Sequence, residues 1–232
     1  MTTTDATGIR HVVFLGNPNT GKTTLFNRLS GLKAKTSNFP GTTQESRTAH
    51  LHDAEGHLAI IDLPGVYSLE LDMSEASICR EVLAGRLAPT GERAGDPDAV
   101  LVVVDSTNLA RNLILVGEVL RRRLPTVVAL NMMDLAEREV LAIDADQLAE
   151  RLGCPVLPIA ARSGRGTDRI LPAARRATIP NHTPPARVKG SKRGPMRSTP
   201  PSCVASVPGT PTNTRAHPPP RTTITMTARC RT

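Results

Sequence analysis

The strongest constraint on this chain is an eight-residue stretch at 16–23, which reads Gly-Asn-Pro-Asn-Thr-Gly-Lys-Thr. It fits the phosphate-loop pattern G-x-x-x-x-G-K-[ST] and lies between an apolar run, 9–15, and a run with helical periodicity, 24–32. The two glycines let backbone N–H groups turn towards phosphate oxygens, Lys22 supplies a positive charge, and Thr23 offers a hydroxyl to Mg²⁺. The order strand, loop, helix therefore predicts a nucleotide-binding α/β fold. The alternative is a glycine-rich turn before an ordinary helix.

Composition divides the chain near residue 180. Residues 180–232 hold 11 of the 20 prolines and nine of the 29 Lys and Arg, but none of the 21 Asp and Glu. The formal charge of +8 therefore describes this tail, which carries +9, whereas residues 1–179 carry −1. We expect a flexible N-terminus at 1–8, a folded domain at 9–179 and a disordered basic tail at 180–232. The basic charge gives no support for nucleic-acid or membrane binding by the folded part.

Cysteine usage and the length of the apolar runs indicate the compartment. The four cysteines, at 79, 154, 203 and 230, include no C-x-x-C pair, which argues against a zinc site and a disulfide framework. No N-terminal stretch resembles a signal peptide, and runs such as 99–104 are far shorter than the ~20 residues of a membrane helix. We expect a protein of the reducing cytoplasm without a transmembrane segment.

Apolar periodicity predicts alternating strands and helices. The expected strands are 9–15, 44–52, 57–61, 99–104, 126–130 and 156–159, and the expected helices are 24–32, 74–87, 109–123, 144–152 and 167–176. Ser74 is the expected N-cap of its helix, and three arginines, 121–123, suit a helix C-terminus. The pattern predicts a doubly wound α/β fold with a mostly parallel sheet, in which ligands bind at the carboxyl ends of the strands.

The expected strands 44–52 and 57–61 form a hairpin in the otherwise parallel pattern. Three histidines, His50, His52 and His57, gather around its turn. Side chains at such positions are more often solvated surface than metal ligands. We therefore expect no metal at these histidines.

A second motif follows the strand 57–61. Asp62-Leu63-Pro64-Gly65 is a D-x-x-G element in which Asp62 can hold a Mg²⁺-bound water. The Gly65 amide can approach a γ-phosphate because no side chain stands in its way. An ordinary turn is the alternative, but the position after an apolar strand favours the functional interpretation.

A third motif follows the strand 126–130 and predicts the base. In Asn131-Met132-Met133-Asp134, the Asp134 carboxylate can accept two hydrogen bonds from guanine, a pair that adenine cannot supply. After the last strand, the stretch 160–162 lies where a backbone N–H could meet guanine O6. The sequence therefore favours GTP over ATP.

These residues together resemble the G domain of the FeoB family, the bacterial ferrous iron transport protein B. The resemblance covers about residues 9–176. Tyr-Ser-Leu after the D-x-x-G and the Asn-Leu-x-Arg-Asn-Leu stretch separate this family from generic small GTPases. The segments that carry it are 16–27, 38–43, 62–69, 108–113 and 129–134.

The resemblance implies a P-loop GTPase that converts GTP to GDP and phosphate. Thr43 would be the switch I threonine that ligates Mg²⁺, together with Thr23 and, through water, Asp62. In the resembled family the asparagine matching Asn19 helps bind K⁺ beside the phosphates; the alternative is that Asn19 only shapes the loop. Val66 stands where many GTPases place a water-orienting glutamine, so we expect slow hydrolysis and assign no catalytic side chain.

The predicted nucleotide-binding set collects these positions. It comprises Gly16, Asn17, Pro18, Asn19, Thr20, Gly21, Lys22, Thr23, Thr24, Gly41, Thr42, Thr43, Asp62, Leu63, Pro64, Gly65, Asn131, Met132, Asp134, Ala160, Ala161 and Arg162.

The sequence departs from the resembled family after about residue 179. The family continues into a helical domain and a membrane region that passes Fe²⁺, and neither is present in this sequence, where the tail reads like translation of another frame or a degenerate end. A membrane transport partner encoded separately is expected, at the cytoplasmic face of the inner membrane. The alternatives are a soluble GTPase acting on RNA or ribosomes and a remnant that only binds nucleotide. The tail has no aromatic residue to stack bases, so no specific nucleic acid is expected.

Overall fold

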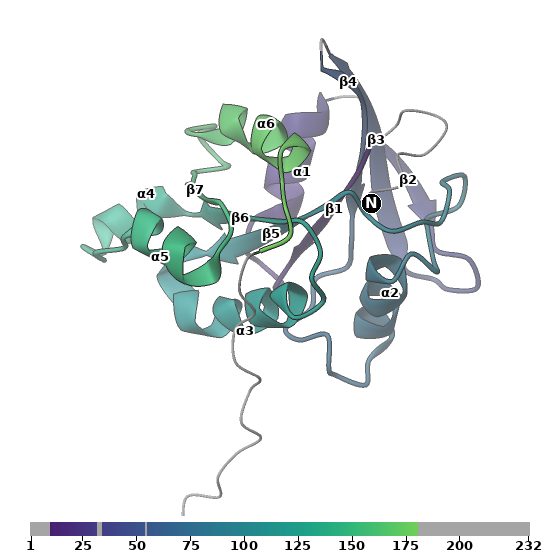
Figure 1. The fold of residues 1–232 in the computed structure, drawn as a ribbon, viewed down its shortest axis with the longest axis horizontal. Helices are drawn as coiled ribbons and strands as arrows, with labels where there is room; N and C mark the ends of the chain where they lie inside the picture. The colour runs from purple at the N-terminus through teal and green to yellow at the C-terminus, as the bar shows by residue number, and fades with distance from the viewer. Residues whose placement is uncertain (1–9, 32–33, 54, 181–232) are drawn as a thin grey trace, which may run out of the picture. The chain divides into compact units, whose positions relative to one another are not determined.

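A seven-stranded mixed sheet organises the protein, whose computed structural model describes residues 10–31, 34–53 and 55–180. The strand order is β2-β3-β4-β1-β5-β6-β7, parallel from β4 to β7, with antiparallel pairs at β2–β3 and β3–β4 (Figure 1). The bounds are β1 Arg10–Gly16, β2 Ala34–Asn38, β3 Glu45–Asp53, β4 Gly56–Asp62, β5 Ala99–Asp105, β6 Thr126–Asn131 and β7 Val156–Pro158. The predicted fold class is confirmed.

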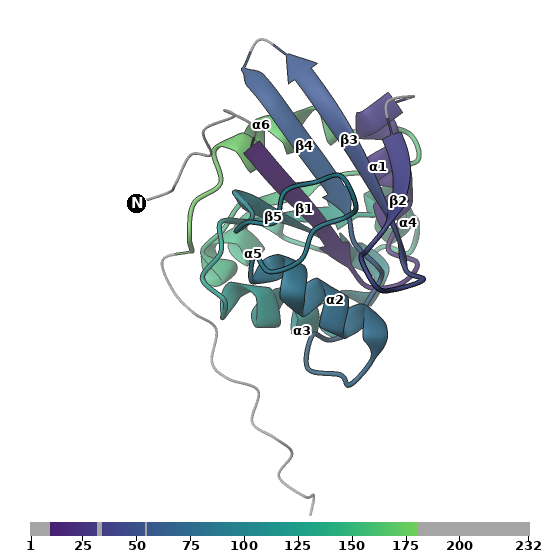
Figure 2. The same cartoon turned by 90° about the vertical axis from the view of Figure 1, so that its right-hand side faces the viewer.

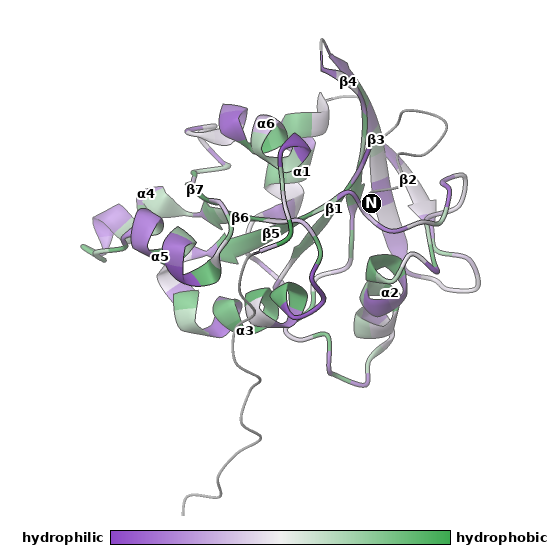
Figure 3. Ribbon diagram, in the orientation of Figure 1, coloured by the Kyte–Doolittle hydropathy of each residue, from purple (hydrophilic) through white to green (hydrophobic). Residues whose placement is uncertain are grey.

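Helices cover both faces of this sheet. They are α1 Lys22–Ser30, α2 Ser74–Leu83, α3 Leu109–Leu120, α4 Met133–Arg138, α5 Ala145–Leu152 and α6 Ile170–Arg175, with 3-10 turns at Ser106–Asn108 and Thr167–Arg169. One core cluster lies between the sheet and α1 with α6, and the other lies between the sheet and α2, α3 and α5. In Figure 3 the central strands are green, whereas α5 shows a purple side. Double coverage explains why β5 and β6 are apolar in their interiors rather than alternating, with polar residues only at strand ends.

The core between the sheet and α1 depends on two aromatic residues. Phe14 of β1 and Phe26 of α1 are fully buried, and their rings meet edge to face with centroids 5.7 Å apart. Such a pair contributes about 0.5–1.5 kcal/mol beyond the area that it buries. This contact holds α1, and with it the phosphate-loop motif, against β1.

Two elements were not predicted. β2, at Ala34–Asn38, is a polar and mostly exposed edge strand, so it has no apolar alternation, and only its pairing with β3 defines it. α4, at Met133–Arg138, has six residues and is too short to show a helical period.

Three predicted helix ends were wrong. α1 begins at Lys22, two residues early, so the motif lysine and threonine belong to its first turn. α2 ends at Leu83 rather than 87, and its N-cap is Met73, because the Ser74 hydroxyl donates to the Glu75 carboxylate at 2.9 Å instead of capping. α3 ends before the three arginines, which follow in a turn.

The expected N-terminal segment, 1–8, and all of the expected tail, 180–232, except its first residue lie outside the described residues. None of the described helices has the length and apolarity that a bilayer-spanning segment requires.

Candidate functional site

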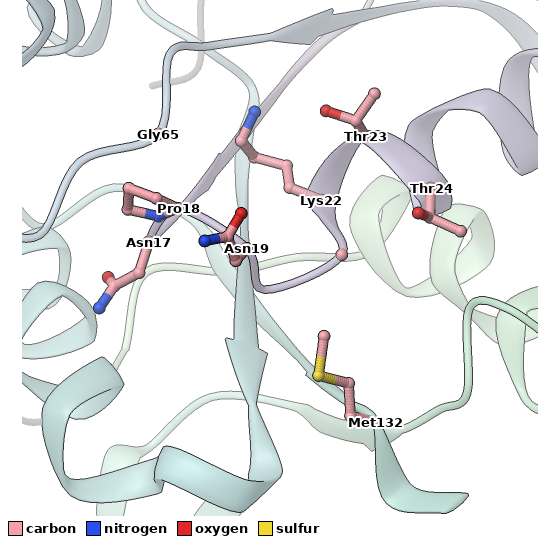
Figure 4. A pocket seen from close by; sticks show the side chains of 9 residues that line it. Asn17, Pro18, Asn19, Lys22, Thr23, Thr24, Gly65 and Met132 are labelled. Carbon is pink, nitrogen blue, oxygen red and sulfur yellow. The ribbon is translucent and has the colours of Figure 1, made fainter. Parts of the chain in front are cut away.

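The phosphate-loop motif connects β1 to α1 and lines a cavity of about 550 Å³. The Lys22 and Asn19 side chains lie over this loop, while Met132 lies across from them (Figure 4). The lining residues are Asn17, Pro18, Asn19, Gly21, Lys22, Thr23, Thr24, Gly65 and Met132. The loop ends at the N-terminus of α1, where free N–H groups and the helix dipole favour an anion.

Gly21 is required by two features of the loop. Its φ is +79°, a left-handed conformation that side chains disfavour, and a Cβ there would lie 2.4 Å from the Asn131 amide nitrogen. Gly65 approaches the loop from the other side, since its Cβ would lie 3.2 Å from the Pro18 Cα. These close backbone approaches bring three motifs together that lie far apart in the sequence.

The D-x-x-G motif lies against the phosphate loop. Lys22, which is 8% exposed, donates from Nζ to the Asp62 carboxylate and to the Leu63 carbonyl oxygen. The Thr23 hydroxyl lies 3.5 Å from the other Asp62 carboxylate oxygen. A hydroxyl and a carboxylate oxygen this close are the hard donors that Mg²⁺ prefers, so Thr23 and Asp62 fit such an ion.

A second cavity, of about 850 Å³, adjoins the first and shares Gly21, Thr24 and Met132 with it. The residues that complete its lining are Asn131, Asp134, Leu135, Arg138, Ala161, Arg162 and Ser163. Asp134 stands in the first turn of α4, directly beyond the carboxyl end of β6. The predicted base-reading carboxylate therefore lies beside the predicted phosphate site.

Asn131 joins the two cavities structurally. Its side chain is 3% exposed, donates to the Thr20 carbonyl oxygen at 2.8 Å and accepts from the Ala161 N–H at 2.8 Å. Asn131, a predicted ligand contact, lines the second cavity, and its side chain also holds the phosphate loop against the 160–162 stretch. Both of its polar groups are buried, so losing either partner would be costly.

The 160–162 stretch has one N–H group free for a ligand. The Ala160 N–H donates to the Arg165 carbonyl at 3.0 Å, and the Ala161 N–H is used by Asn131. Within the described residues, the Arg162 N–H has no hydrogen-bond acceptor, so it is the donor of this stretch that could meet a base oxygen. Arg28 of α1 fixes the stretch by donating to the carbonyl oxygens of residues 161 and 162, both at 2.8 Å. No motif signals this role of Arg28, because its partners lie 133 and 134 residues away.

The segment after the D-x-x-G motif is anchored to α3. Val66 is 5% exposed, and its N–H donates to the Gly16 carbonyl at 3.1 Å. The buried Glu118 carboxylate accepts from the Ser68 hydroxyl and from the Leu69 N–H, both at 2.6 Å. Tyr67 is exposed, and the Arg111 guanidinium lies 4.0 Å from its ring centroid. Glu118 was missed because its partners lie 50 residues earlier in the chain.

Nine of the predicted positions line neither cavity: Gly16, Thr20, Gly41, Thr42, Thr43, Asp62, Leu63, Pro64 and Ala160. Asp62 and Leu63 nevertheless contact Lys22 directly. Gly41, Thr42 and Thr43 lie in the turn between β2 and β3, and all three are exposed. The Thr42 N–H and hydroxyl both donate to the carbonyl oxygen of the buried Phe39 at 3.1 Å, which fixes the conformation of this turn. Thr43 as a third Mg²⁺ ligand remains a prediction.

Neither described cysteine is poised for nucleophilic chemistry. Cys79 and Cys154 are both free and buried. Burial raises the pKa of each thiol to about 12, so both stay protonated at neutral pH.

Known proteins share these features. The family model described as ferrous iron transport protein B matches residues 10–174. The Fe(2+) transporter FeoB of Salmonella typhimurium is 40% identical over 156 residues, which are 67% of this chain and 20% of the transporter. The chain thus spans about a fifth of the length of the curated relatives that it matches.

Two solved structures show the same likeness. A GDP-bound variant of the S. thermophilus FeoB G domain is 33% identical, with a TM-score of 0.65 over 73% of this chain and 61% of that one. The G domain of T. maritima FeoB is 31% identical, with a TM-score of 0.64 over 72% of this chain and 98% of that one. The match over nearly all of an isolated G domain, with the three motifs gathered at one sheet edge, shows that this chain belongs to the ferrous iron transport protein B (FeoB) family and contains its G domain.

Proposed function

We propose that this chain binds GTP and GDP across the two adjoining cavities and hydrolyses GTP to GDP and phosphate. The observation that carries the proposal is the meeting of Lys22, Asp62 and Thr23 at the carboxyl ends of β1 and β4, next to Asp134 at the end of β6. Ligands of doubly wound sheets bind at this edge. The related S. thermophilus G domain is a GDP-bound structure.

Different groups of the chain contact the phosphates in the first cavity and the base in the second. Lys22 and the N–H groups at the start of α1 offset phosphate charge, while Asp134 and the Arg162 N–H read the guanine edge. Thr23 and Asp62 would hold Mg²⁺, which when bound neutralises charge on the phosphate oxygens. Asn19 lines the phosphate cavity and is exposed there, so its amide oxygen is accessible to a K⁺ ion.

We expect hydrolysis to be slow because Val66 cannot orient water. The valine is buried against the core below α2 and α3, and no polar atom replaces the glutamine that many GTPases use. What acceleration there is must come from charge stabilisation by Lys22, backbone N–H groups and bound cations.

Base selection is tested by calorimetry. GDP should bind far more tightly than ADP, because Asp134 accepts the two donors of guanine. Asp134→Asn should erase much of this preference and shift affinity towards xanthosine diphosphate, by at least tenfold in the ratio. Asp146→Asn, at an exposed position in the first turn of α5, is the matched control and should change neither affinity. Comparable affinities of the unchanged protein for GDP and ADP would contradict the proposal.

We further propose that this G domain serves ferrous iron transport through a membrane partner at the cytoplasmic face of the inner membrane. The support is membership of the family, whose curated members are named Fe(2+) transporters. Affinity purification from detergent-solubilised membranes should recover a hydrophobic partner that depends on the bound nucleotide. Recovery of no membrane protein with either GDP or a non-hydrolysable GTP analogue would contradict it.

A further inference from the structure

Four of the chain's six histidines lie on one face of three neighbouring strands. His50 of β3 and His11 of β1 both pair with Ala59 of β4, and His52 of β3 pairs with His57 of β4. They stand at the hairpin end of β4, whereas Asp62 stands at its other end. Five residues of strand separate His57 from Asp62, which is about 16 Å, so the histidines are not part of the nucleotide site.

Two of these imidazoles and a carboxylate form a connected group. His50 Nδ1 lies 3.2 Å from His57 Nε2, and His50 Nε2 lies 2.9 Å from Glu92 Oε1. The His52 ring stacks on the His57 ring at a centroid distance of 3.9 Å. Glu92 comes from the connection between α2 and β5, which crosses in front of β1 in Figure 2. His50 and His57 are half-buried and open to solvent.

The Glu92 contact fixes the tautomer of His50. An ionised carboxylate can only accept, so in a neutral His50 imidazole the Nε2–H donates to Glu92 and the Nδ1 lone pair faces His57. A carboxylate on the far nitrogen of a histidine is the outer contact that orients metal-binding imidazoles in proteins.

The separation of the two nitrogens suits a shared metal ion. Two imidazole nitrogens bound tetrahedrally at zinc distances stand about 3.3 Å apart. The observed 3.2 Å between His50 Nδ1 and His57 Nε2 therefore needs almost no movement of the strands.

The sequence alone predicts no metal at these histidines, but from the contacts that the structure adds we propose that His50 and His57 form a site for a first-row divalent transition metal ion, with Glu92 orienting His50 and solvent completing the coordination. Among the described residues, no three His, Cys, Asp or Glu side chains are arranged to hold a metal ion together. The site is thus a two-ligand, exchangeable one, weaker than a structural zinc centre with four protein ligands. It is specific for metals that accept imidazole, so Mg²⁺, which prefers oxygen, does not compete.

The test is calorimetric titration of Zn²⁺ into the full chain with GDP and excess Mg²⁺ present. His50→Gln and His57→Gln should each weaken Zn²⁺ binding at least tenfold, because glutamine keeps a polar side chain but supplies no imidazole. Glu92→Gln should weaken it about tenfold, as expected for an outer-shell contact. His52→Gln, which removes the stacked but non-ligating ring, should change it less than twofold. The histidines and cysteines of the tail are the same in every variant, so differences between variants report on this site.

A second measurement needs no substitution. Added Co²⁺ should broaden the imidazole NMR signals of His50 and His57 first, in the unchanged protein with GDP bound. Unchanged Zn²⁺ affinity in both ligand variants would overturn the proposal and leave His50 and His57 joined by a hydrogen bond alone. An equal loss in His52→Gln, or Co²⁺ broadening elsewhere first, would overturn the ligand assignment.

Discussion

At the scale of single residues, Asn19 and Val66 set the expected chemistry of hydrolysis. If Asn19 holds K⁺, replacing Na⁺ with K⁺ at constant ionic strength should raise kcat with little change in GTP affinity, since the ion acts on transition-state charge. Asn19→Ala should remove this response, whereas Lys22→Ala should weaken nucleotide binding in either salt. Steady-state phosphate release measures both. Equal kcat in K⁺ and Na⁺ for the unchanged protein would leave Asn19 as a loop-shaping residue.

Gly21 gives a second prediction at this scale. Gly21→Ala must adopt a left-handed φ and place its Cβ against the Asn131 amide, so we expect a loss of about 1–3 kcal/mol in stability and at least tenfold in GDP affinity. Gly91→Ala is the matched control, because Gly91 also has a positive φ, +91°, but meets nothing within 4 Å. The control should lose about 1 kcal/mol of stability and no GDP affinity. Equal effects of the two changes on GDP affinity would show that the contact with Asn131 is unimportant.

Motif residues can be predicted from the sequence, whereas the residues that support them cannot. The positions of Lys22, Asp62 and Asp134 follow from local patterns after apolar strands, because the sheet brings strand ends to one edge. Arg28 and Glu118 act on partners far along the chain, and an arginine or glutamate on a helix looks like ordinary surface. Only the tertiary contacts distinguish them.

At the scale of elements, the link between α3 and the 65–69 segment rests on Glu118. Glu118→Gln replaces the charged carboxylate that accepts two hydrogen bonds with a neutral amide, so the free energy of unfolding should fall by about 1.5–3 kcal/mol. Glu70→Gln is the control, since Glu70 is 60% exposed and its ion pair with Arg121, at 3.5 Å, should contribute less than about 1 kcal/mol. Urea denaturation measures both. A change of similar size in the two variants would mean that the buried carboxylate does not anchor the segment.

The individual strands also show where hydrophobic periodicity predicts secondary structure and where it does not. β5 and β6 are apolar except at their ends and are predicted within a residue of those ends, because a strand covered on both faces needs apolar side chains on both. β2 has one protected side at most, and its five polar and small residues carry no pattern. The hairpin β3–β4 is predicted because its turn chemistry and its alternation agree.

At the scale of the whole domain, the Arg175 side chain links α6, the last described helix, to the β3–β4 hairpin. Its side chain is 5% exposed and pairs with Asp53 at 2.8 Å, and it also donates to the carbonyl oxygens of Glu55 and Gly56. Arg175→Ala should lower the free energy of unfolding by about 1.5–3 kcal/mol, because it removes charge-assisted hydrogen bonds from a buried position. The neighbouring Arg176 is 75% exposed at 3.6 Å from Glu55, so Arg176→Ala should cost less than about 0.5 kcal/mol. Thermal unfolding with GDP absent separates the two, and equal melting temperatures would contradict this role.

The position of Asn131 between the two cavities has a consequence for how ligand fragments bind. A nucleoside that occupies the second cavity rigidifies the Asn131 side-chain amide, which also holds the phosphate loop. The cost in conformational entropy of ordering both cavities therefore falls on the first ligand to bind, and the second ligand does not incur it again. Guanosine and pyrophosphate, added together as separate molecules, should therefore each bind more tightly than either does alone. In Asn131→Ala this mutual gain in affinity should vanish, so that guanosine and pyrophosphate bind independently of each other.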